Sequence, residues 1–373
     1  MIHALCIIGT RPETIKMAPV VGALKGRGDD FRCTVCVTAQ HRKMLDDALA
    51  EFTIVPDYDL DVMQDAQGPG HVAASVLAGI DPVLARERPD WVIVQGDTTT
   101  TMAAALAAFY QGIRVGHVEA GLRTGDRWSP FPEEVHRRVV ALCATLHFAP
   151  TAGARRNLLA EGVAEVDIVV TGSTVVDALK AVTAHAGRPA ALEDRGERLL
   201  LVTLHRRESF GVPMRHVCLA LRELARAYQG DVRVICLVHP NPAVSTVLEE
   251  ELSGIANLQL LPPQCYADMA RLMQRAYLIL TDSGGLQEEA PALGVPVLVL
   301  REVTERWESL DVGAAIVVGT DPARIMREAR RLLDDPKAHA QMARRTNPYG
   351  DGFAGERIAD ALLSRGASGH RSH

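Results

Sequence analysis

The sequence predicts an α/β protein built from two doubly wound, Rossmann-like domains that face one another across a cleft. With 373 residues, the chain is long for one hydrophobic core and suits two domains of similar size. Short apolar runs alternate with helical stretches through the first half, and a second series of such runs begins after about residue 175. Strands that alternate with helices at this spacing favour a parallel sheet covered on both faces.

The first domain is predicted from four apolar runs, each followed by a glycine-rich or polar turn. The expected strands span residues 4–8, 33–38, 91–94 and 115–118. The expected helices span residues 13–26, 43–52 and 102–110. Ligands of doubly wound sheets bind beyond the carboxyl ends of the strands. Chemically active residues are therefore expected directly after these strands.

The second domain is predicted from strands at residues 199–203, 232–238, 258–261, 278–280 and 295–300. Residues 185–197, rich in alanine, glycine, proline and charge, are interpreted as a linker or a loop at a domain edge. The resulting boundaries are residues 1–175 for the first domain and 176–355 for the second. Residues 356–373 are expected to form a C-terminal helix followed by a small, polar, disordered tail.

Composition argues against two classes of partner. A formal net charge of −6 and an isoelectric point near 6.1 indicate no basic surface for nucleic acid. No apolar stretch reaches the roughly 18 residues of a membrane span, and the order of charges at the N-terminus is not that of a signal peptide.

Seven cysteines, most of them in apolar runs, favour reduced thiols in the cytoplasm. Cys33 and Cys36 form a CxxC motif within one strand, where they point to opposite faces, so a metal or redox pair is disfavoured.

Cations and carboxylates follow the strand ends of the first domain. Arg11 and Lys16 lie in GTRPETIK, a strand-to-helix turn whose backbone N–H groups also point outward. The GxxxxGK[ST] pattern of a Walker loop is absent from it. Asp97 lies in QGDTTTT, Glu119 in GHVEAGLRTGD, and Glu133 at the helix start in SPFPEEVHRR. Each acidic residue alone fits a helix cap or a dipole partner, but together they indicate a cleft lined with carboxylates.

Groups suited to anions follow the strand ends of the second domain. His205 precedes two arginines in LVTLHRRESFG, and an imidazole beside guanidinium groups fits a diphosphate. Ser283, Gly284 and Gly285 form a turn into a helix, where backbone N–H groups donate to phosphate. The QEE that follows supplies a carboxylate one turn further, as a ribose diol requires. These residues predict a protein that binds a nucleotide diphosphate, and they leave glycosyl transfer and epimerisation equally open.

The motifs occur in the order and spacing of a known family. They run from GTRPETIKMAPV through TAQHRKML, QGDTTTT, GHVEAGLRTGD, SPFPEE, TGSTVVDAL, HRRESFG, HPNP, LTDSGGLQEEAP and TER to NPYGDG. Over residues 1 to about 355 the chain resembles the non-hydrolysing UDP-N-acetylglucosamine (UDP-GlcNAc) 2-epimerases. The resemblance implies a glycosyltransferase-B-type architecture, a homodimer, and no NAD, other cofactor or catalytic metal. It also implies interconversion of UDP-GlcNAc and UDP-ManNAc, for surface polysaccharides, by elimination and re-addition of UDP through 2-acetamidoglucal.

The resemblance also implies roles for individual residues. The acid–base carboxylates are expected to be Asp97, Glu119 and Glu133, with His205 as the catalytic imidazole near the diphosphate. Which carboxylate is the base and which the acid stays open. The expected UDP-binding residues are Arg11, Lys16, Ser283, Gly284, Gly285, Glu289 and Arg306, with Gln264 and Met269 at the uracil end. A site for a second UDP-GlcNAc as activator is expected at Gln40, Gln67, Arg206 and His239.

Among the positions that depart from the family pattern, such as Ser209 in place of the usual Asn, three bear on the substrate. Met269 stands where an aromatic residue beside uracil is usual, Leu204 where a small residue is usual, and Trp307 where proline is usual. These changes keep a 2-epimerase of a related UDP-2-acetamido sugar as an alternative. A UDP-sugar transferase of the same architecture and a non-catalytic UDP-sugar sensor are two further alternatives. The carboxylate motifs and His205 favour the epimerase over both.

Overall fold

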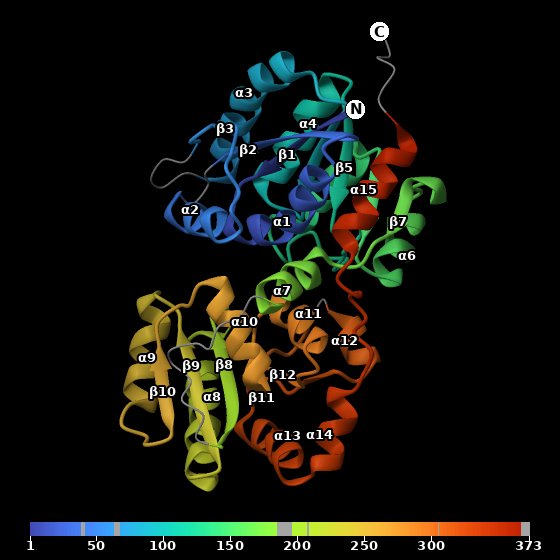
Figure 1. The fold of residues 1–373 in the computed structure, drawn as a ribbon. Coiled ribbons are helices and arrows are strands. Elements are labelled where there is room, and N and C mark those ends of the chain that lie inside the picture. The colour runs from blue at the N-terminus through green and yellow to red at the C-terminus, as the bar shows by residue number, and fades with distance from the viewer. Residues whose placement is uncertain (39–41, 63–67, 185–195, 207–208, 305, 367–373) are drawn as a thin grey trace. The chain divides into compact units, whose positions relative to one another are not determined.

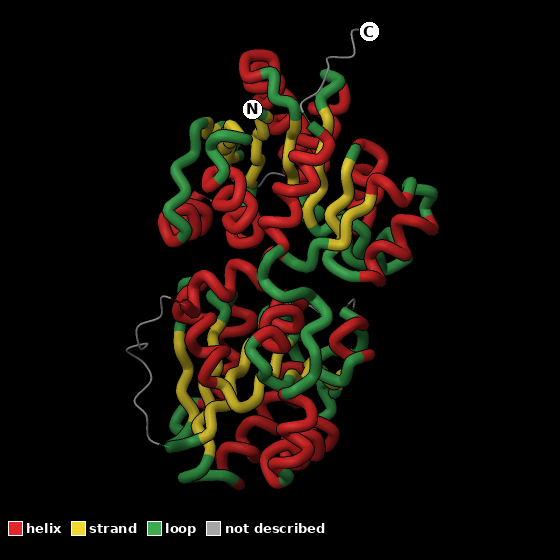
Figure 2. The backbone as a smooth tube through the Cα atoms, turned by 45° about the vertical axis from the view of Figure 1, so that its right-hand side comes forward, coloured by secondary structure: helices red, strands yellow, loops and turns green. Residues whose placement is uncertain are grey.

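The computed structural model describes residues 1–38, 42–62, 68–184, 196–206, 209–304 and 306–366. The chain divides into two compact units, of which the first comprises Met1–Ala178 and Tyr349–His373 and the second Leu179–Pro348. Each unit contains one parallel sheet with helices on both of its faces, as Figures 1 and 2 show. The predicted α/β class with two Rossmann-like domains is confirmed.

The first sheet has the strand order β3-β2-β1-β4-β5-β6-β7. Its strands are β1 (Ile2–Ile8), β2 (Phe31–Val37), β3 (Tyr58–Asp59), β4 (Trp91–Gln95), β5 (Arg114–Val118), β6 (Leu146–Ala149) and β7 (Ile168–Val170). The four strands predicted here are confirmed, whereas β3, β6 and β7 are too short to stand out as apolar runs. The chain order reverses between β1 and β4, and doubly wound sheets bind their ligands at such a switch point.

Helices cover both faces of this sheet. They are α1 (Arg11–Gly26), α2 (Arg42–Glu51), α3 (Pro69–Glu87), α4 (Thr99–Tyr110), α5 (Glu133–Cys143), α6 (Ala152–Ala160) and α15 (Ala354–Arg365), with a short 3-10 helix η1 (Glu165–Asp167). The chain passes from the first unit to the second within α7 (Thr174–Ala184), whose Leu179 is buried in the core of the second. Buried residues of α1 and α15 pack on one face of the sheet, and those of α3 and α4 pack on the other. Cys33 and Cys36 lie on these opposite faces, as predicted.

The C-terminal segment belongs to the first unit, which corrects the predicted boundaries. Those boundaries assigned residues 176–355 to the second domain and treated 356–373 as a separate segment. Instead, Ile358 and Leu362 of α15 are fully buried in the core beside α1, and the Gly355 N–H donates to Oδ1 of Asp177 at 2.8 Å. An apolar helix face shows that a helix is covered, but its periodicity does not show by what. The tail beyond residue 366 and residues 185–195 of the predicted linker lie outside the described residues.

The second sheet has the strand order β10-β9-β8-β11-β12-β13. Its strands are β8 (Arg198–Leu204), β9 (Val232–Val238), β10 (Leu258–Leu261), β11 (Ala276–Thr281), β12 (Val297–Val299) and β13 (Ala315–Val317). The five strands predicted here are confirmed, with β12 shorter than expected, and β13 is an addition. The chain order again reverses at the first strand of the domain, so β8 and β11 flank a second switch point.

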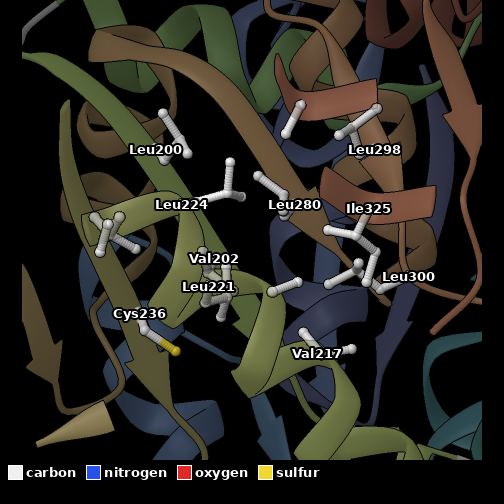
Figure 3. Close-up of a cluster of buried hydrophobic side chains, with 14 of the residues drawn as sticks. Leu200, Val202, Val217, Leu221, Leu224, Cys236, Leu280, Leu298, Leu300 and Ile325 are labelled. Carbon is white, nitrogen blue, oxygen red and sulfur yellow. The ribbon is translucent and has the colours of Figure 1, made fainter. Parts of the chain in front are cut away.

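The core of the second unit anchors the strands that lead to this switch point. Its helices are α8 (Val212–Ala227), α9 (Pro242–Leu252), α10 (Tyr266–Arg275), α11 (Gly284–Ala292), α12 (Trp307–Asp311), α13 (Pro322–Asp334) and α14 (Pro336–Ala343). Figure 3 shows Leu200 and Val202 of β8 in one cluster with Leu221 and Leu224 of α8 and Ile325 of α13. Burial of each such side chain contributes about 1.5–3 kcal/mol, so the carboxyl end of β8 has a well-defined position.

The described helices include none that is both long and apolar enough to cross a membrane.

Candidate active site

A buried carboxylate ties together the loops that follow β1 and β4. Glu13, in the first turn of α1, is 2% exposed and accepts a hydrogen bond from the Gly9 N–H at 2.7 Å. It also accepts from the hydroxyls of Thr98 (2.6 Å) and Thr101 (2.8 Å). Burial raises the pKa of Glu13, and these donors offset only part of that rise. The network holds the β4–α4 loop, which carries Asp97, against the start of α1. No sequence motif predicted this role for Glu13.

Asp97 is held by a guanidinium from α5. Its Oδ2 atom accepts from Nε and Nη2 of Arg137 at 2.8 and 2.7 Å. The Nδ1–H of His136 donates to the backbone carbonyl of Asp97 at 2.9 Å. The Arg137 side chain is only 8% exposed, and charge-assisted bonds of this geometry are strong and directional. Arg137 therefore positions Asp97 at the switch point of the first sheet, a role that the sequence motifs did not reveal.

Glu119 directly follows β5 and turns back towards α1. Its backbone has a φ of 65°, in the left-handed region that costs a non-glycine residue roughly 1–3 kcal/mol and is concentrated at functional sites. Its carboxylate forms an ion pair with Nζ of Lys16, and both side chains are largely buried. Arg11, the first residue of α1, is half-buried at the same end of the sheet. The structure thus brings Glu119, Lys16 and Arg11 to the carboxyl ends of β5 and β1, the two strands that flank β4.

The two glutamates that begin α5 have different environments. Glu134 is fully buried, and its Oε2 accepts from the Thr124 N–H at 3.1 Å and pairs with Nη1 of Arg137 at 3.3 Å. Glu133 is half-buried, and its Oε2 atom is buried without a hydrogen-bond partner among the described residues. A buried acceptor without a donor is unfavourable unless a water or a ligand supplies one. Glu134 is therefore committed to internal contacts, whereas Oε2 of Glu133 is an acceptor that a water or a ligand can satisfy.

In the second unit, His205 directly follows β8 and rests on a buried aspartate. The His205 Nδ1 lies 2.9 Å from Oδ1 of Asp282, which has a fully buried side chain, whereas the imidazole is 37% exposed. Burial raises the pKa of Asp282, but its bonds to the His205 ring and to backbone N–H groups outweigh that effect and hold the pKa below its usual range. Asp282 lies within the motif TDSGGLQEEAP, but the sequence pattern predicts no role for it.

The turn after β11 forms the start of α11. Ser283 is the N-cap of this helix, its own N–H donates to Oγ1 of Thr281 at 2.9 Å, and Gly284 and Gly285 form the first turn. A Cβ atom on Gly285 would lie 3.4 Å from Oε1 of Glu289, so glycine leaves room beside that carboxylate. Small residues at a helix N-terminus have the geometry that an anion site requires, and Glu289 lies one turn further along.

Three further predicted residues lie near α10 and α11. Arg306, at the start of α12, is 7% exposed and donates from Nε to Oε1 of Glu288 at 2.5 Å. Gln264 precedes α10 and donates from Nε2 to the carbonyl of Pro262 at 2.6 Å. Met269 is half-buried in α10 and packs against the core of the second unit. The ion pair of Arg306 with Glu288 fixes the arginine against α11, next to the turn that contains Ser283.

A sequence profile described as UDP-N-acetylglucosamine 2-epimerase matches residues 23–363, which is most of the chain. The chain belongs to the UDP-GlcNAc 2-epimerase family. Its family activity is inversion at carbon 2 of UDP-GlcNAc, which makes it an isomerase. The resemblance seen in the motifs is thereby confirmed.

Relatives in this epimerase family are similar over nearly their full length. The UDP-N-acetylglucosamine 2-epimerase of Yersinia pestis is 51% identical over 368 residues, covering 96% of this chain and 97% of that protein. The Neisseria meningitidis UDP-GlcNAc 2-epimerase, solved bound to UDP-GlcNAc, has a TM-score of 0.91 at 41% identity. The match covers 97% of this chain and 100% of that chain. The glycosyltransferase of kitacinnamycin shares the fold alone, with 15% identity and a TM-score of 0.67. That match covers 98% of this chain and 99% of that chain.

The activator site predicted from the epimerase family is only partly described. Gln40 and Gln67 lie outside the described residues. The Arg206 N–H donates to Oδ2 of Asp282 at 2.9 Å, and the exposed His239 follows β9 with its ring 6.5 Å from that of His205. Arg206 and His239 thus lie beside the His205 imidazole, and activation by a second UDP-GlcNAc stays a prediction.

Proposed function

We propose that the chain interconverts UDP-GlcNAc and UDP-ManNAc by elimination and re-addition of UDP. A base removes the proton from C2, the electron pair of that C–H bond forms the C1–C2 double bond, and the C1–O bond breaks. The bonding electrons of C1–O leave with the β-phosphate oxygen, which yields UDP and 2-acetamidoglucal. Re-addition of UDP at C1, with a proton delivered to the opposite face of C2, gives the epimer. Each proton transfer by a positioned side chain contributes about 10²–10⁴-fold to the rate.

One observation carries this proposal: the three carboxylates of the first unit have different partners. Asp97 is paired with Arg137 and Glu119 with Lys16, so both carboxylates are held in fixed orientations. Among the described residues, Glu133 has no Lys or Arg nitrogen in salt-bridge range, and its Oε2 lacks a donor. We assign Glu133 to the exchange of a proton with C2, and Asp97 and Glu119 to the acceptance of protons and the orientation of the sugar.

The second unit supplies the groups that stabilise the departing diphosphate, which is the larger energetic requirement. His205 and the start of α11 at Ser283, Gly284 and Gly285 are assigned to the phosphates. The remaining UDP contacts are assigned to Arg11, Lys16, Glu289 and Arg306, with Gln264 and Met269 at uracil. The Neisseria relative bound to UDP-GlcNAc and a Methanocaldococcus jannaschii relative solved with UDP-GlcNAc and UDP support this ligand class.

Incubation of the purified protein with UDP-GlcNAc in D₂O tests the proposal. Proton NMR is expected to show UDP-ManNAc, loss of the C2 proton signal from both sugars as deuterium enters, and traces of UDP and 2-acetamidoglucal. Elimination exposes C2 to solvent, so exchange accompanies each turnover. An unchanged UDP-GlcNAc spectrum, or epimerisation that retains the C2 proton, would contradict the proposal. Sugar transfer only on addition of an acceptor would favour the glycosyltransferase.

We propose that the chain forms a homodimer through the surface of α4 and α5. Large apolar side chains are exposed there: Tyr110 at the end of α4 is 71% exposed and Leu142 of α5 is 84% exposed. Phe109, next to Tyr110, is 56% exposed. Clustered exposed apolar side chains of this kind mark protein interfaces.

Light scattering during gel filtration tests the dimer. Wild type is expected at twice the chain mass, and the double change Tyr110→Glu with Leu142→Glu is expected to shift it to the mass of one chain, because two buried charges oppose the contact. Val166 of η1 is 72% exposed and lies on another element, so Val166→Glu is the matched control and is expected to stay dimeric. A monomeric wild type, or an unchanged dimer in the double variant, would rule out this surface.

We place the reaction in the cytoplasm, where its product would supply N-acetylmannosamine units for surface polysaccharides. All seven cysteines are free thiols, and Cys265 is exposed. Free exposed thiols persist in a reducing compartment and are oxidised outside it.

A further inference from the structure

A fully buried carboxylate lies beneath His205 and has no part in the mechanism above. Asp282 follows β11, and its side chain has no exposed surface. It accepts from the His205 ring at 2.9 Å, from the His205 N–H at 3.0 Å and from the Arg206 N–H at 2.9 Å. The Ser209 hydroxyl adds a weak contact at 3.4 Å. Because Asp282 is sealed from solvent, it acts on a substrate only through the groups that it holds.

Asp282 determines which nitrogen of the His205 ring carries the hydrogen. The donors around this carboxylate favour its ionised form, as its lowered pKa indicates. A carboxylate 2.9 Å from Nδ1 can only accept a hydrogen bond, so Nδ1 is the nitrogen that donates. His239 also faces the ring, with its ring 6.5 Å away; burial and the neighbouring His205 lower the pKa of His239, which favours its neutral form. Asp282 thus supplies a fixed charge in direct contact with the ring.

We propose that Asp282 is a positioning residue that orients His205 with Nε2 directed outward, towards the departing diphosphate. With Nδ1–H committed to Asp282, Nε2 is the ring nitrogen left for a phosphate oxygen. The backbone N–H groups of His205 and Arg206 hold the Asp282 carboxylate in place, and the carboxylate in turn holds the ring. The inference rests on the proposed function for the identity of the ligand, and adds to it the group that sets the orientation and the tautomer of the imidazole.

A double-mutant cycle separates this role from a purely structural one. Asp282→Asn keeps the size of the side chain but removes its charge, and it is expected to lower kcat roughly 10–100-fold, as loss of an outer-shell partner does. In a His205→Gln background the same change is expected to lower kcat less than about 3-fold, because its effect passes through the ring. An equal loss in both backgrounds would mean that Asp282 merely supports the loop, and the proposal would be wrong.

Two measurements do not depend on turnover. The ¹⁵N spectrum of the wild-type protein is expected to show His205 with a proton on Nδ1; a neutral ring protonated only on Nε2 would overturn the proposal even if no variant folds. In Asp282→Asn the amide can face Nδ1 with either its oxygen or its NH₂ group, so the ¹⁵N spectrum is expected to lose the single form that carries the proton on Nδ1.

Ser209→Ala removes only the 3.4 Å contact and serves as the control, with an unchanged His205 ¹⁵N spectrum. If Asp282→Asn changes the His205 tautomer in a protein that leaves UDP-GlcNAc untouched, the Asp282–His205 pair is retained and the proposed function is rejected. If Asp282→Asn leaves the tautomer unchanged in an active enzyme, the role of the pair is rejected and the proposed function is retained.

Discussion

Replacing Glu133 with glutamine is expected to lower kcat for epimerisation by about 10²–10⁴-fold, which is the range for loss of one general acid–base group. The amide has the same shape as the carboxylate but cannot exchange a proton with C2. Because Oε2 of Glu133 has no partner among the described residues, the change breaks no hydrogen bond of that atom. The melting temperature and the affinity for UDP are therefore expected to stay close to those of wild type.

Glu134→Gln is the matched comparison, one residue along the same helix. Glu134 is fully buried and bonded to Arg137 and to the Thr124 N–H, so removal of its charge is expected to lower the melting temperature measurably. Stopped assays of UDP-ManNAc formation with thermal unfolding of both variants provide the test. Glu133→Gln within about threefold of wild-type activity would contradict the assignment of Glu133 to proton exchange.

Acidification is expected to destabilise the first unit by several kcal/mol through two buried histidines. His117 of β5 and His147 of β6 are paired in register, and each is 2% exposed or less. Burial lowers the pKa of His117 to about 3 and that of His147 to about 4. In the unfolded chain both titrate near 6.5. The unfolded state therefore binds more protons at every pH between these values.

The sign and the pH window follow from these shifts. The stability that neutral His117 and His147 provide is complete above about pH 6.5 and is lost as the pH falls towards 4 and then 3. Between pH 6.5 and 5 the loss is roughly 1.4 kcal/mol per pH unit for each histidine, or about 4 kcal/mol for both. Urea unfolding at pH 8, 6 and 5 measures the slope.

Variants of His117 and His147 test whether these two histidines cause the loss of stability at low pH. The double change His117→Asn with His147→Asn is expected to flatten the slope, since neither amide titrates, even if it lowers stability at pH 8. Asparagine at 117 can keep a donor near the Gly96 carbonyl, which His117 Nε2 contacts at 2.8 Å. His71, exposed on α3, provides the control: His71→Asn should retain the wild-type slope. A slope that survives the double change would assign the acid sensitivity to other groups.

Local sequence signals account for much of this architecture. The runs at 4–8 and 199–203 are buried on both faces of a parallel sheet, so they read as continuous apolar segments and are recognised directly. The short strands β3 and β7 bury few side chains and leave no such signal. The C-terminal helix is visible as a helix, but its place beside α1 depends on a surface formed some 340 residues earlier, as the burial of Ile358 shows.

The candidate site likewise contains residues that the sequence predicts and partners that only the folded chain reveals. Asp97, Glu119, His205 and Ser283 were recognisable because each directly follows a strand, and the carboxyl ends of parallel strands meet at one edge. That inference requires only the order of elements along the chain. The partners of these residues required the folded chain: Arg137 reaches Asp97 across 40 positions and Asp282 reaches His205 across 77. Pairing between distant residues depends on how helices and loops pack over the sheet, and short-range patterns carry no record of that geometry. The sequence therefore identifies the candidate groups, and the packing establishes which of them are paired and which, like Oε2 of Glu133, have no partner among the described residues.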